Sequence, residues 1–481
     1  MRHAYTVETI RQAEAELAAT LPDGTLMQRA AAGLAAVVMR VLQESRGGVY
    51  GARVVLLVGV GDNGGDALFA GALLQRRGVA IRALTADPDR VHGDGMRALL
   101  TAGGQSGGVD FSGYSFNGAD LILDGLLGIG GKGGLRGAAA ELGRAAARSG
   151  VPIIAVDLPS GIDADTGEVS GDAIDAAVTV AFGTYKPGLL IEPGAGRTGV
   201  LEFVDLGLGP HLPEEAEVEA LQDADLAALL PSPARSVDKY RRGVAGVACG
   251  SVKYPGAALL ALGGALRSGV GAVRYLGPVE VTTTHPEVMV GEGRVQAWTV
   301  GCGMDRTTTG SVLTFHKLLG YKDVPLLIDA EGLAMLDKSG LKQLAARTAP
   351  TVLTPHAGEA AALLGVERAE VEAQPLAHVR ALVELTGATV LLKGPTTLIA
   401  GPDRHTVRVN PTGTPVLATA GSGDVLAGLI GGLLAAGLDP VDAASAGSYL
   451  HGMAGRIAAR QGPVAAGDLL RSLRTAWHNS Q

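Results

Sequence analysis

Short apolar runs alternate with amphipathic stretches along most of the chain. In the N-terminal part the apolar runs begin at Arg53, Ala80, Leu121, Pro152, Ala177 and Val200. Stretches with helical spacing, such as residues 135–150, lie between them. This alternation is typical of β-α-β units, which build a parallel sheet with helices on both faces. Because the runs are apolar at nearly every position, we expect both faces of the sheet to be covered.

The alternation stops between Gly209 and Ser236, in an acidic stretch with four prolines and no strand pattern. It resumes with apolar runs that begin at Gly243, Arg294, Val324 and Ala388. A chain of 481 residues also exceeds what one hydrophobic core usually serves. We therefore predict two α/β domains, residues 1–212 and 231–481, joined by residues 213–230 as a linker with a short helix.

Composition and charge narrow the functional classes. Hydrophobic residues make up 47% and charged residues 18%, which is typical of a globular protein. The net charge of −8, with no basic run, argues against binding to nucleic acid or to an anionic membrane. The N-terminus lacks a secretory apolar segment, and the apolar run from Val425 is too short to cross a bilayer. We expect a soluble cytoplasmic protein, with Cys249 and Cys302 as buried, reduced thiols.

Four polar clusters follow strands of the first predicted domain: residues 62–66, Asp124, residues 128–134, and the segment that begins at Asp157. Ligands of doubly wound sheets bind at the carboxyl ends of the strands. Each cluster also has a plain structural interpretation, because an Asp or Asn in such a turn often only caps a helix, and a glycine-rich loop with one lysine is often a solvated turn. Four clusters at the ends of one sheet favour a ligand site.

These clusters suggest two kinds of chemistry. Asn63, Asp124 and Ser160 offer oxygen ligands, which suit a hard cation rather than zinc. Asp157 and Lys132 are titratable groups on strand-end loops and form a candidate acid–base pair.

In the second predicted domain, Gly421-Ser422-Gly423-Asp424 opens a long apolar helix. The free N–H groups and positive end of such a helix attract anions, and a carboxylate beside them can deprotonate a hydroxyl that attacks a phosphoryl group. The alternative is that Asp424 only caps the helix. The turn from Lys393 to Thr397 can hold a nucleotide phosphate and favours the first interpretation.

The segments GVGDNGGDA (59–67), LDGLLGIGGKG (123–133) and AVDLPSGIDADTG (155–167) closely resemble the epimerase domain of bifunctional NAD(P)H-hydrate repair enzymes. The resemblance implies a Rossmann-like fold that interconverts the R and S forms of nicotinamide hydrated at C6. It also implies that potassium is held by Asn63, Asp124 and Ser160, and that Asp157 faces the nicotinamide ring with Lys132 as its partner. The hydrate's phosphates and ribose would contact Asp62, Asn63, Gly64, Gly65 and Asp66, and Gly128, Ile129, Gly130, Gly131, Lys132, Gly133 and Gly134. Asp62 replaces the family's usual asparagine, which argues against direct phosphate contact by its side chain.

The segments 239–273 and LTPHAGEAAALLG (353–365) resemble the ADP-dependent NAD(P)H-hydrate dehydratases, which have a ribokinase-like fold. The resemblance implies that Asp424 is the catalytic carboxylate and that Mg²⁺ and ADP are used. The residues implied to contact the hydrate are Ala257, Gly303 and His356, and those implied to hold the adenylate are Lys393, Gly394, Pro395, Thr396, Thr397 and Gly423. Taken alone, His356 is more typical of a histidine that starts a helix and binds no ligand. Cys302 replaces the proline of the family's G-P-G turn, which loosens that turn.

Taken together, the resemblance implies a repair enzyme that is a homo-oligomer. Its first domain would convert the R hydrate to the S hydrate, and its second would use ADP to dehydrate the S form, releasing AMP, phosphate and NAD(P)H. Two alternatives remain open from the residues. One is a small-molecule kinase of the hydroxymethylpyrimidine type with a non-catalytic nucleotide-binding first domain, and the other is a module that only senses nucleotides.

Overall fold

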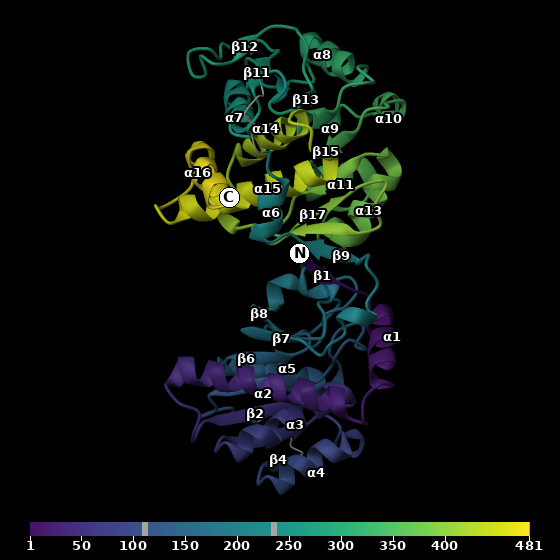
Figure 1. Ribbon diagram of the computed structural model, residues 1–481, viewed down its shortest axis with the longest axis vertical. Coiled ribbons are helices and arrows are strands. Elements are labelled where there is room, and N and C mark those ends of the chain that lie inside the picture. Colours follow the sequence, from purple (N-terminus) through teal and green to yellow (C-terminus); the bar gives the residue numbers. More distant parts are fainter. Residues whose placement is uncertain (108–113, 232–237, 481) are drawn as a thin grey trace. The chain divides into compact units, whose positions relative to one another are not determined.

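The computed structural model describes residues 1–107, 114–231 and 238–480, and the chain forms two compact units (Figure 1). The N-terminal unit comprises His3–Glu217. The C-terminal unit comprises the chain from Val218 onward together with Met1–Arg2. The α/β class expected from the alternation is confirmed in both units.

The segment expected as a linker is largely built into the C-terminal unit. Strand β9 (Val218–Ala220) pairs with β18 (Val407–Asn410), and helix α6 (Asp223–Leu229) follows it. Arg408 of β18 forms ion pairs with Glu219 of β9, at 2.7 Å, and with Asp442. The boundary between the units, after Glu217, lies within the expected linker, and α6 is the short helix expected there. Residues 232–236 of the proline-containing stretch lie outside the described residues.

The N-terminal unit contains a seven-stranded sheet in the order β4-β3-β2-β5-β6-β7-β8, and all its neighbouring strands are parallel. The strands are β2 (Arg53–Val58), β3 (Ala80–Thr85), β4 (Gln105–Gly107), β5 (Leu121–Gly125), β6 (Ile153–Val156), β7 (Val178–Phe182) and β8 (Val200–Val204). The α-helices are α1 (Val7–Ala18), α2 (Thr25–Arg46), α3 (Asp62–Arg76), α4 (Gly93–Thr101) and α5 (Gly137–Ser149).

Strand β2 has apolar side chains on both faces of the sheet. Side chains of a strand alternate between faces. Val54, Leu56 and Val58 contribute to one core with α2 and α3, whereas Val55 and Leu57 contribute to a second core with α5. Burying each such side chain stabilises the fold by about 1.5–3 kcal/mol, which explains why the strand is apolar at consecutive positions.

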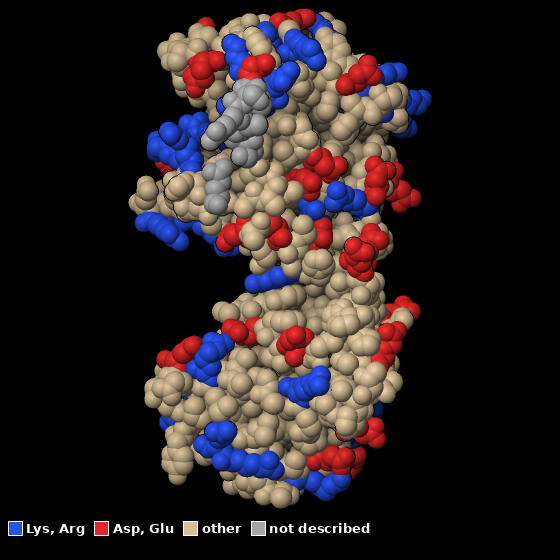
Figure 2. All heavy atoms as spheres, viewed as in Figure 1, with Lys and Arg blue, Asp and Glu red and all other residues tan. Residues whose placement is uncertain are grey.

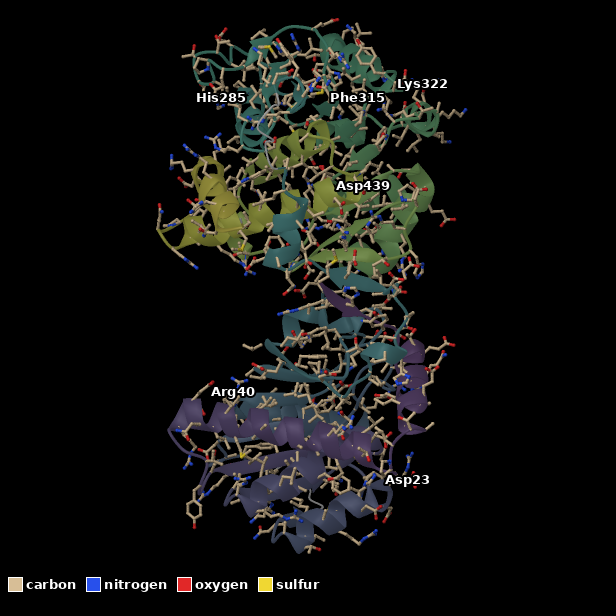
Figure 3. The ribbon with its side chains drawn as sticks, viewed as in Figure 1. Asp23, Arg40, His285, Phe315, Lys322 and Asp439 are labelled. Atoms are coloured by element: carbon tan, nitrogen blue, oxygen red, sulfur yellow. The ribbon has the colours of Figure 1, made fainter. Side chains whose placement is uncertain are left out.

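Helix α2 is the one helix of the described residues that is long and apolar enough to span a bilayer. Its buried side chains, among them Leu34, Val38 and Leu42, belong to the core of the N-terminal unit. On its exposed side, Arg40 forms an ion pair with Glu202 of β8 at 2.7 Å; Arg40 is labelled in Figure 3. These contacts are typical of a core helix that packs on a sheet.

The C-terminal unit contains an eleven-stranded sheet in the order β1-β9-β18-β17-β16-β15-β14-β13-β10-β11-β12. Strand β17 is antiparallel to both of its neighbours, and the other pairings recorded for this sheet are parallel. Its remaining strands are β1 (Arg2–Ala4), β10 (Val244–Ala248), β11 (Ala272–Tyr275), β12 (Met289–Val290), β13 (Ala297–Val300), β14 (Leu326–Ile328), β15 (Thr351–Leu353), β16 (Thr389–Leu392) and β17 (Thr397–Ala400). The remaining helices are α7 (Pro255–Ala265), α8 (Thr309–Leu319), α9 (Glu331–Ala334), α10 (Lys338–Ala345), α11 (Ala357–Leu364), α12 (Arg368–Ala373), α13 (Pro375–Thr386), α14 (Ser422–Ala435), α15 (Pro440–Ala459) and α16 (Ala466–Asn479).

Helices α7 and α14 pack closely in the core of the C-terminal unit. From Val425 to Ala435, every residue of α14 is buried. A Cβ atom on Gly428 would lie 1.9 Å from the carbonyl oxygen of Ala261 in α7, so only glycine allows this approach. The packing holds the first turn of α14, which carries Asp424, in a fixed position.

Charged side chains of both signs are interspersed on the visible face of each unit (Figure 2). This agrees with the small negative net charge of the sequence.

Candidate active sites

The N-terminal unit has a cavity of about 750 Å³ at the carboxyl ends of its strands. Helix α1, the start of α3 and the loops after β5 and β6 line it, and so does Asp23, labelled in Figure 3. Five acidic residues line it: Glu14, Asp23, Asp62, Asp66 and Asp157. Its size is suited to a cofactor-sized ligand.

The cluster Asp62–Asp66 forms the first turn of α3 rather than a loop before it. Gly61, with φ of +96°, turns the chain into the helix. A Cβ atom on Gly64 would lie 2.5 Å from the carbonyl oxygen of Gly59, so the backbone here must be glycine. Asp62 and Asn63 line the cavity at the helix end, where unpaired N–H groups favour an anion.

The three residues expected to hold a cation lie together. The backbone N–H and Oγ of Ser160 donate to the Asp124 carboxylate at 2.8 and 2.7 Å. The carbonyl oxygen of Leu127 accepts from Ser160 Oγ at 3.1 Å and from Asn63 Nδ2 at 3.0 Å. Asp124 is fully buried; burial raises its pKa to about 6, although the Ser160 hydrogen bonds act in the opposite direction. This set of oxygen atoms fits a hard cation, and the binding itself remains a prediction.

Asp157 forms its ion pair with Lys186, not with Lys132 as the sequence led us to expect. Lys186 is 1% exposed and also donates to the carbonyl oxygen of Phe182 at 3.0 Å. Lys186 follows β7, the neighbour of β6 in the sheet, so it lies beside the residue that follows β6. Lys132 is exposed on the loop after β5 and does not line the cavity. The expected Asp157–Lys132 pair is therefore wrong.

Asp157 has a left-handed backbone, with φ of +65°, which is uncommon for a residue other than glycine. Its carboxylate also accepts the backbone N–H of Phe182 at 3.0 Å. Strained backbones cluster at functional sites, which supports a site at this position.

The glycine-rich loop after β5 contributes to the cavity only in part. Gly128, Ile129, Gly130 and Gly131 line it. Gly133 and Gly134, like Lys132, do not, and a Cβ atom on Gly134 would lie 3.0 Å from the backbone of Gly171. Gly134 therefore packs on Gly171, whereas Lys132 and Gly133 are exposed.

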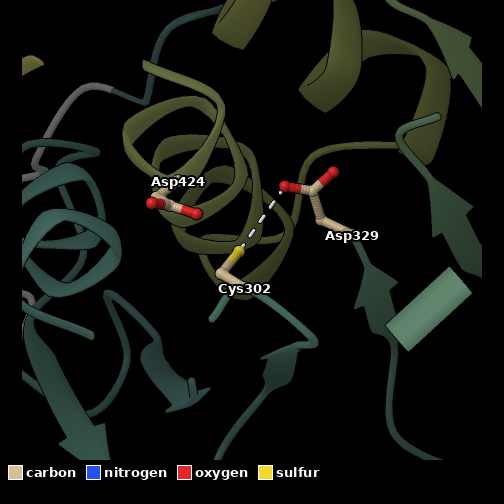
Figure 4. A group of neighbouring side chains, drawn as sticks. All are labelled: Cys302, Asp329 and Asp424. Atoms are coloured by element: carbon tan, nitrogen blue, oxygen red, sulfur yellow. Dashed lines mark hydrogen bonds between the residues drawn. The ribbon is translucent and has the colours of Figure 1, made fainter. Parts of the chain in front are cut away.

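In the C-terminal unit, Asp424 lies in the first turn of α14, near Cys302 and Asp329 (Figure 4). One side-chain ligand atom from each of the three residues lies within 4.8 Å of the others. Cys302 Sγ donates to Asp329 Oδ2 at 3.5 Å. Burial raises the pKa of Asp424 to about 7, and Asp329 adds to this effect, whereas Lys393 and Cys302 oppose it. A carboxylate with such a pKa is suited to accept a proton near neutral pH.

Asp329 is a site residue that the sequence reasoning did not single out. It follows β14, and its Oδ1 accepts from Lys393 Nζ at 2.7 Å and from Thr354 Oγ1 at 2.9 Å. An acidic residue at the end of the apolar run from Val324 was the available signal. A Cβ atom on Gly423 would lie 3.6 Å from Lys393 Nζ, so the expected adenylate residues Lys393 and Gly423 are brought together.

The other expected residues lie around this centre. A Cβ atom on Gly303 would lie 2.3 Å from Cβ of Ala257, so these two residues are adjacent. His356 caps α11: its Nδ1 accepts the N–H groups of Gly358 and Glu359 at 3.0 and 3.2 Å. The backbone of His356 also forms an isolated parallel β-bridge with that of Lys393. Gly394, Pro395 and Thr396 form the turn between β16 and β17, and Thr397 begins β17.

Two family models match the chain, one in each unit. The model described as "NAD(P)H-hydrate dehydratase" matches residues 245–475, and that described as "YjeF-related protein N-terminus" matches residues 23–188. The bifunctional NAD(P)H-hydrate repair enzyme Nnr of Mycobacterium leprae (strain TN) is 45% identical over 488 residues, covering 99% of each chain. This chain belongs to the bifunctional NAD(P)H-hydrate repair enzymes.

Another member of this family and one solved structure support this assignment. The bifunctional NAD(P)H-hydrate repair enzyme Nnr of Mycobacterium tuberculosis (strain CDC 1551 / Oshkosh) is 46% identical over 453 residues, covering 92% of each chain. A crystal structure of the ADP/ATP-dependent NAD(P)H-hydrate dehydratase from Bacillus subtilis, with ATP/Mg²⁺, matches 55% of this chain and 99% of its own. Its TM-score is 0.50 at 29% identity. The repair family therefore accounts for both units, which the kinase interpretation does not.

Proposed function

We infer that the protein repairs hydrated NADH and NADPH. The N-terminal unit interconverts the R and S hydrates, and the C-terminal unit dehydrates the S form with ADP, giving NAD(P)H, AMP and phosphate. The observation that carries this proposal is the match to repair enzymes along nearly the whole chain. Asp329, Lys393 and Asp424 lie within residues 245–475, the range that the dehydratase model matches.

In the dehydratase unit, Asp424 accepts the proton of the hydrate's hydroxyl as that oxygen attacks the β-phosphoryl group of ADP. Phosphate then leaves in place of hydroxide, which is a much poorer leaving group. The N-terminus of α14 and Lys393 stabilise the negative charge of the transferring group. Bound Mg²⁺ supplies further neutralisation of this charge. The Bacillus subtilis dehydratase was co-crystallized with ATP/Mg²⁺, which supports the use of a nucleotide with magnesium.

In the epimerase unit, the hydrate occupies the cavity with its phosphates at the start of α3 and its nicotinamide ring near Asp157. Asn63, Asp124, Ser160 and the Leu127 carbonyl are the residues that would hold potassium. The ion would supply a fixed positive charge beside the anionic substrate. The buried ion pair with Lys186 holds the Asp157 carboxylate in place. We further propose that the protein acts in the cytoplasm as a homo-oligomer.

The decisive experiment is an incubation of mixed R and S hydrates with ADP and Mg²⁺, followed by recovery of reduced-nicotinamide absorbance. Complete recovery is expected, because the R form is converted and then consumed. Asp424→Asn should abolish recovery and leave R/S interconversion intact. Recovery that stops when the S form is exhausted would contradict the epimerase half. ATP-dependent phosphorylation of a vitamin precursor, with no action on hydrates, would instead support the kinase alternative.

A further inference from the structure

Asp66 is a buried acidic side chain in the cavity of the N-terminal unit. It is 9% exposed, and its Oδ1 atom has no hydrogen-bond partner among the described residues. It lines the cavity one helical turn after Asp62. A buried carboxylate without a partner is costly when ionised, so the surroundings favour its protonated form.

The acidic side chains near Asp66 also favour its protonated form. Burial is the largest cause that raises its pKa well above the ordinary value, and Asp157, Asp62 and Glu14 add to it, whereas Lys186 opposes it. Glu14, on α1, also has a raised pKa, first through burial and then through Asp157. The one buried cation of this group, Lys186, is paired with Asp157. The surroundings therefore favour the protonated acid at Asp66, beside an Asp157 carboxylate that is paired with Lys186.

An acid and a carboxylate in one cavity are what exchange of a hydroxyl group requires. We propose that Asp66 is the general acid of epimerisation, which protonates the C6 hydroxyl of the hydrate, with Asp157 as the matching base. This inference rests on the proposed epimerase activity and adds a residue and a chemical route to it.

In the forward direction Asp66 gives its proton to the hydroxyl, the C6–O bond breaks, and water leaves with the bonding electrons. The lone pair of the ring nitrogen forms a double bond to C6. Water then adds to the opposite face of C6, the electrons return to the nitrogen, and Asp157 accepts the proton of the added water. The reverse reaction uses Asp157 as acid and Asp66 as base. After each turnover, proton exchange with solvent restores the starting protonation states of Asp66 and Asp157.

The test compares the full chain with its Asp66→Asn variant, which keeps the size of the side chain but cannot donate the same proton. Epimerisation of the R hydrate should fall about 100-fold or more in kcat, with KM little changed. Dehydration of the S hydrate by the same preparation should be unaffected, which shows that the C-terminal unit is folded, and the unchanged KM for the R hydrate shows that the cavity of the N-terminal unit is intact. The control is Asp89→Asn, an exposed aspartate outside the cavity. Epimerisation at the parent rate, or a loss confined to KM, would overturn the proposal.

Two further readouts separate a catalytic from a structural role. The parent rate should fall as pH rises through the pKa of Asp66, and Asp66→Asn should lack this decline. In oxygen-18-labelled water the S product should carry solvent oxygen; retention of the original oxygen would overturn the water-loss step. If the parent chain does not epimerise the hydrate, the proposed function fails rather than the role of Asp66 within it.

Discussion

Lys393 Nζ lies 2.7 Å from Oδ1 of Asp329, so a lysine after β16 and an aspartate after β14 form an ion pair beside the first turn of α14. Glu359 lies at 3.9 Å from the same ammonium group. Burial acts to lower the pKa of Lys393, but the carboxylates of Asp329 and Glu359 outweigh it and the pKa is raised. The raised pKa favours a charged lysine at the position proposed for the phosphoryl group of the nucleotide.

This arrangement predicts the pH dependence of the dehydratase. Asp424 must be ionised to accept a proton, so activity should rise with pH through about 7 and level off above it. Asp329→Asn removes a negative neighbour and should move this rise to lower pH, because the ionised form of Asp424 is then less disfavoured. The measurement is kcat/KM for the S hydrate against pH. A shift of the rise to higher pH would contradict the assignment.

The buried pair of Lys186 and Asp157 should be important for stability as well as activity. Lys186→Met leaves a buried carboxylate without its cation, and loss of one partner of such a pair costs about 3–5 kcal/mol. Urea unfolding of the N-terminal unit measures this cost. Lys132→Met is the matched control, since Lys132 is exposed and its loss should not change the free energy of unfolding. An equal decrease in the free energy of unfolding of both variants would contradict a stabilising role for the Lys186–Asp157 ion pair.

Potassium removal should slow only the epimerase. Exchange of K⁺ for tetramethylammonium, which is too large for the oxygen cluster of Asn63, Asp124 and Ser160, is expected to lower R/S interconversion and leave dehydration of the S hydrate unchanged. Asp124→Asn should reproduce the loss and remove the response to K⁺. An epimerase rate that is independent of the cation in the parent chain would exclude a functional potassium site there.

Helices α7 and α14 pack too closely to accommodate a side chain at position 428. Gly428→Ala places a methyl group where the carbonyl oxygen of Ala261 lies and should cost about 3 kcal/mol of unfolding free energy. Gly467→Ala, on α16, meets no atom within 4 Å and is the matched control. Thermal unfolding compares the two variants. A destabilised Gly467→Ala with an unaffected Gly428→Ala would contradict the packing described.

The alternating pattern predicted both sheets, because strands covered on two faces must be apolar at consecutive positions. It also predicted the convergence of Asn63, Asp124 and Ser160, since parallel strands bring their carboxyl ends to one edge. Lys186 and Asp329 were missed because pairing across neighbouring strands depends on strand order, which the pattern does not encode. Strand β9 was missed because three residues, Val218–Ala220, are too few to show a period.

The double ion pair of Arg408 has a practical consequence for dissecting the two halves. A dehydratase fragment that starts at residue 231, where the sequence pattern suggests a boundary, lacks Glu219 and leaves a nearly inaccessible guanidinium with Asp442 as its remaining carboxylate partner. A fragment that starts at Val218 retains both carboxylates and strand β9. Expression trials of the isolated halves should therefore cut the polypeptide between Glu217 and Val218.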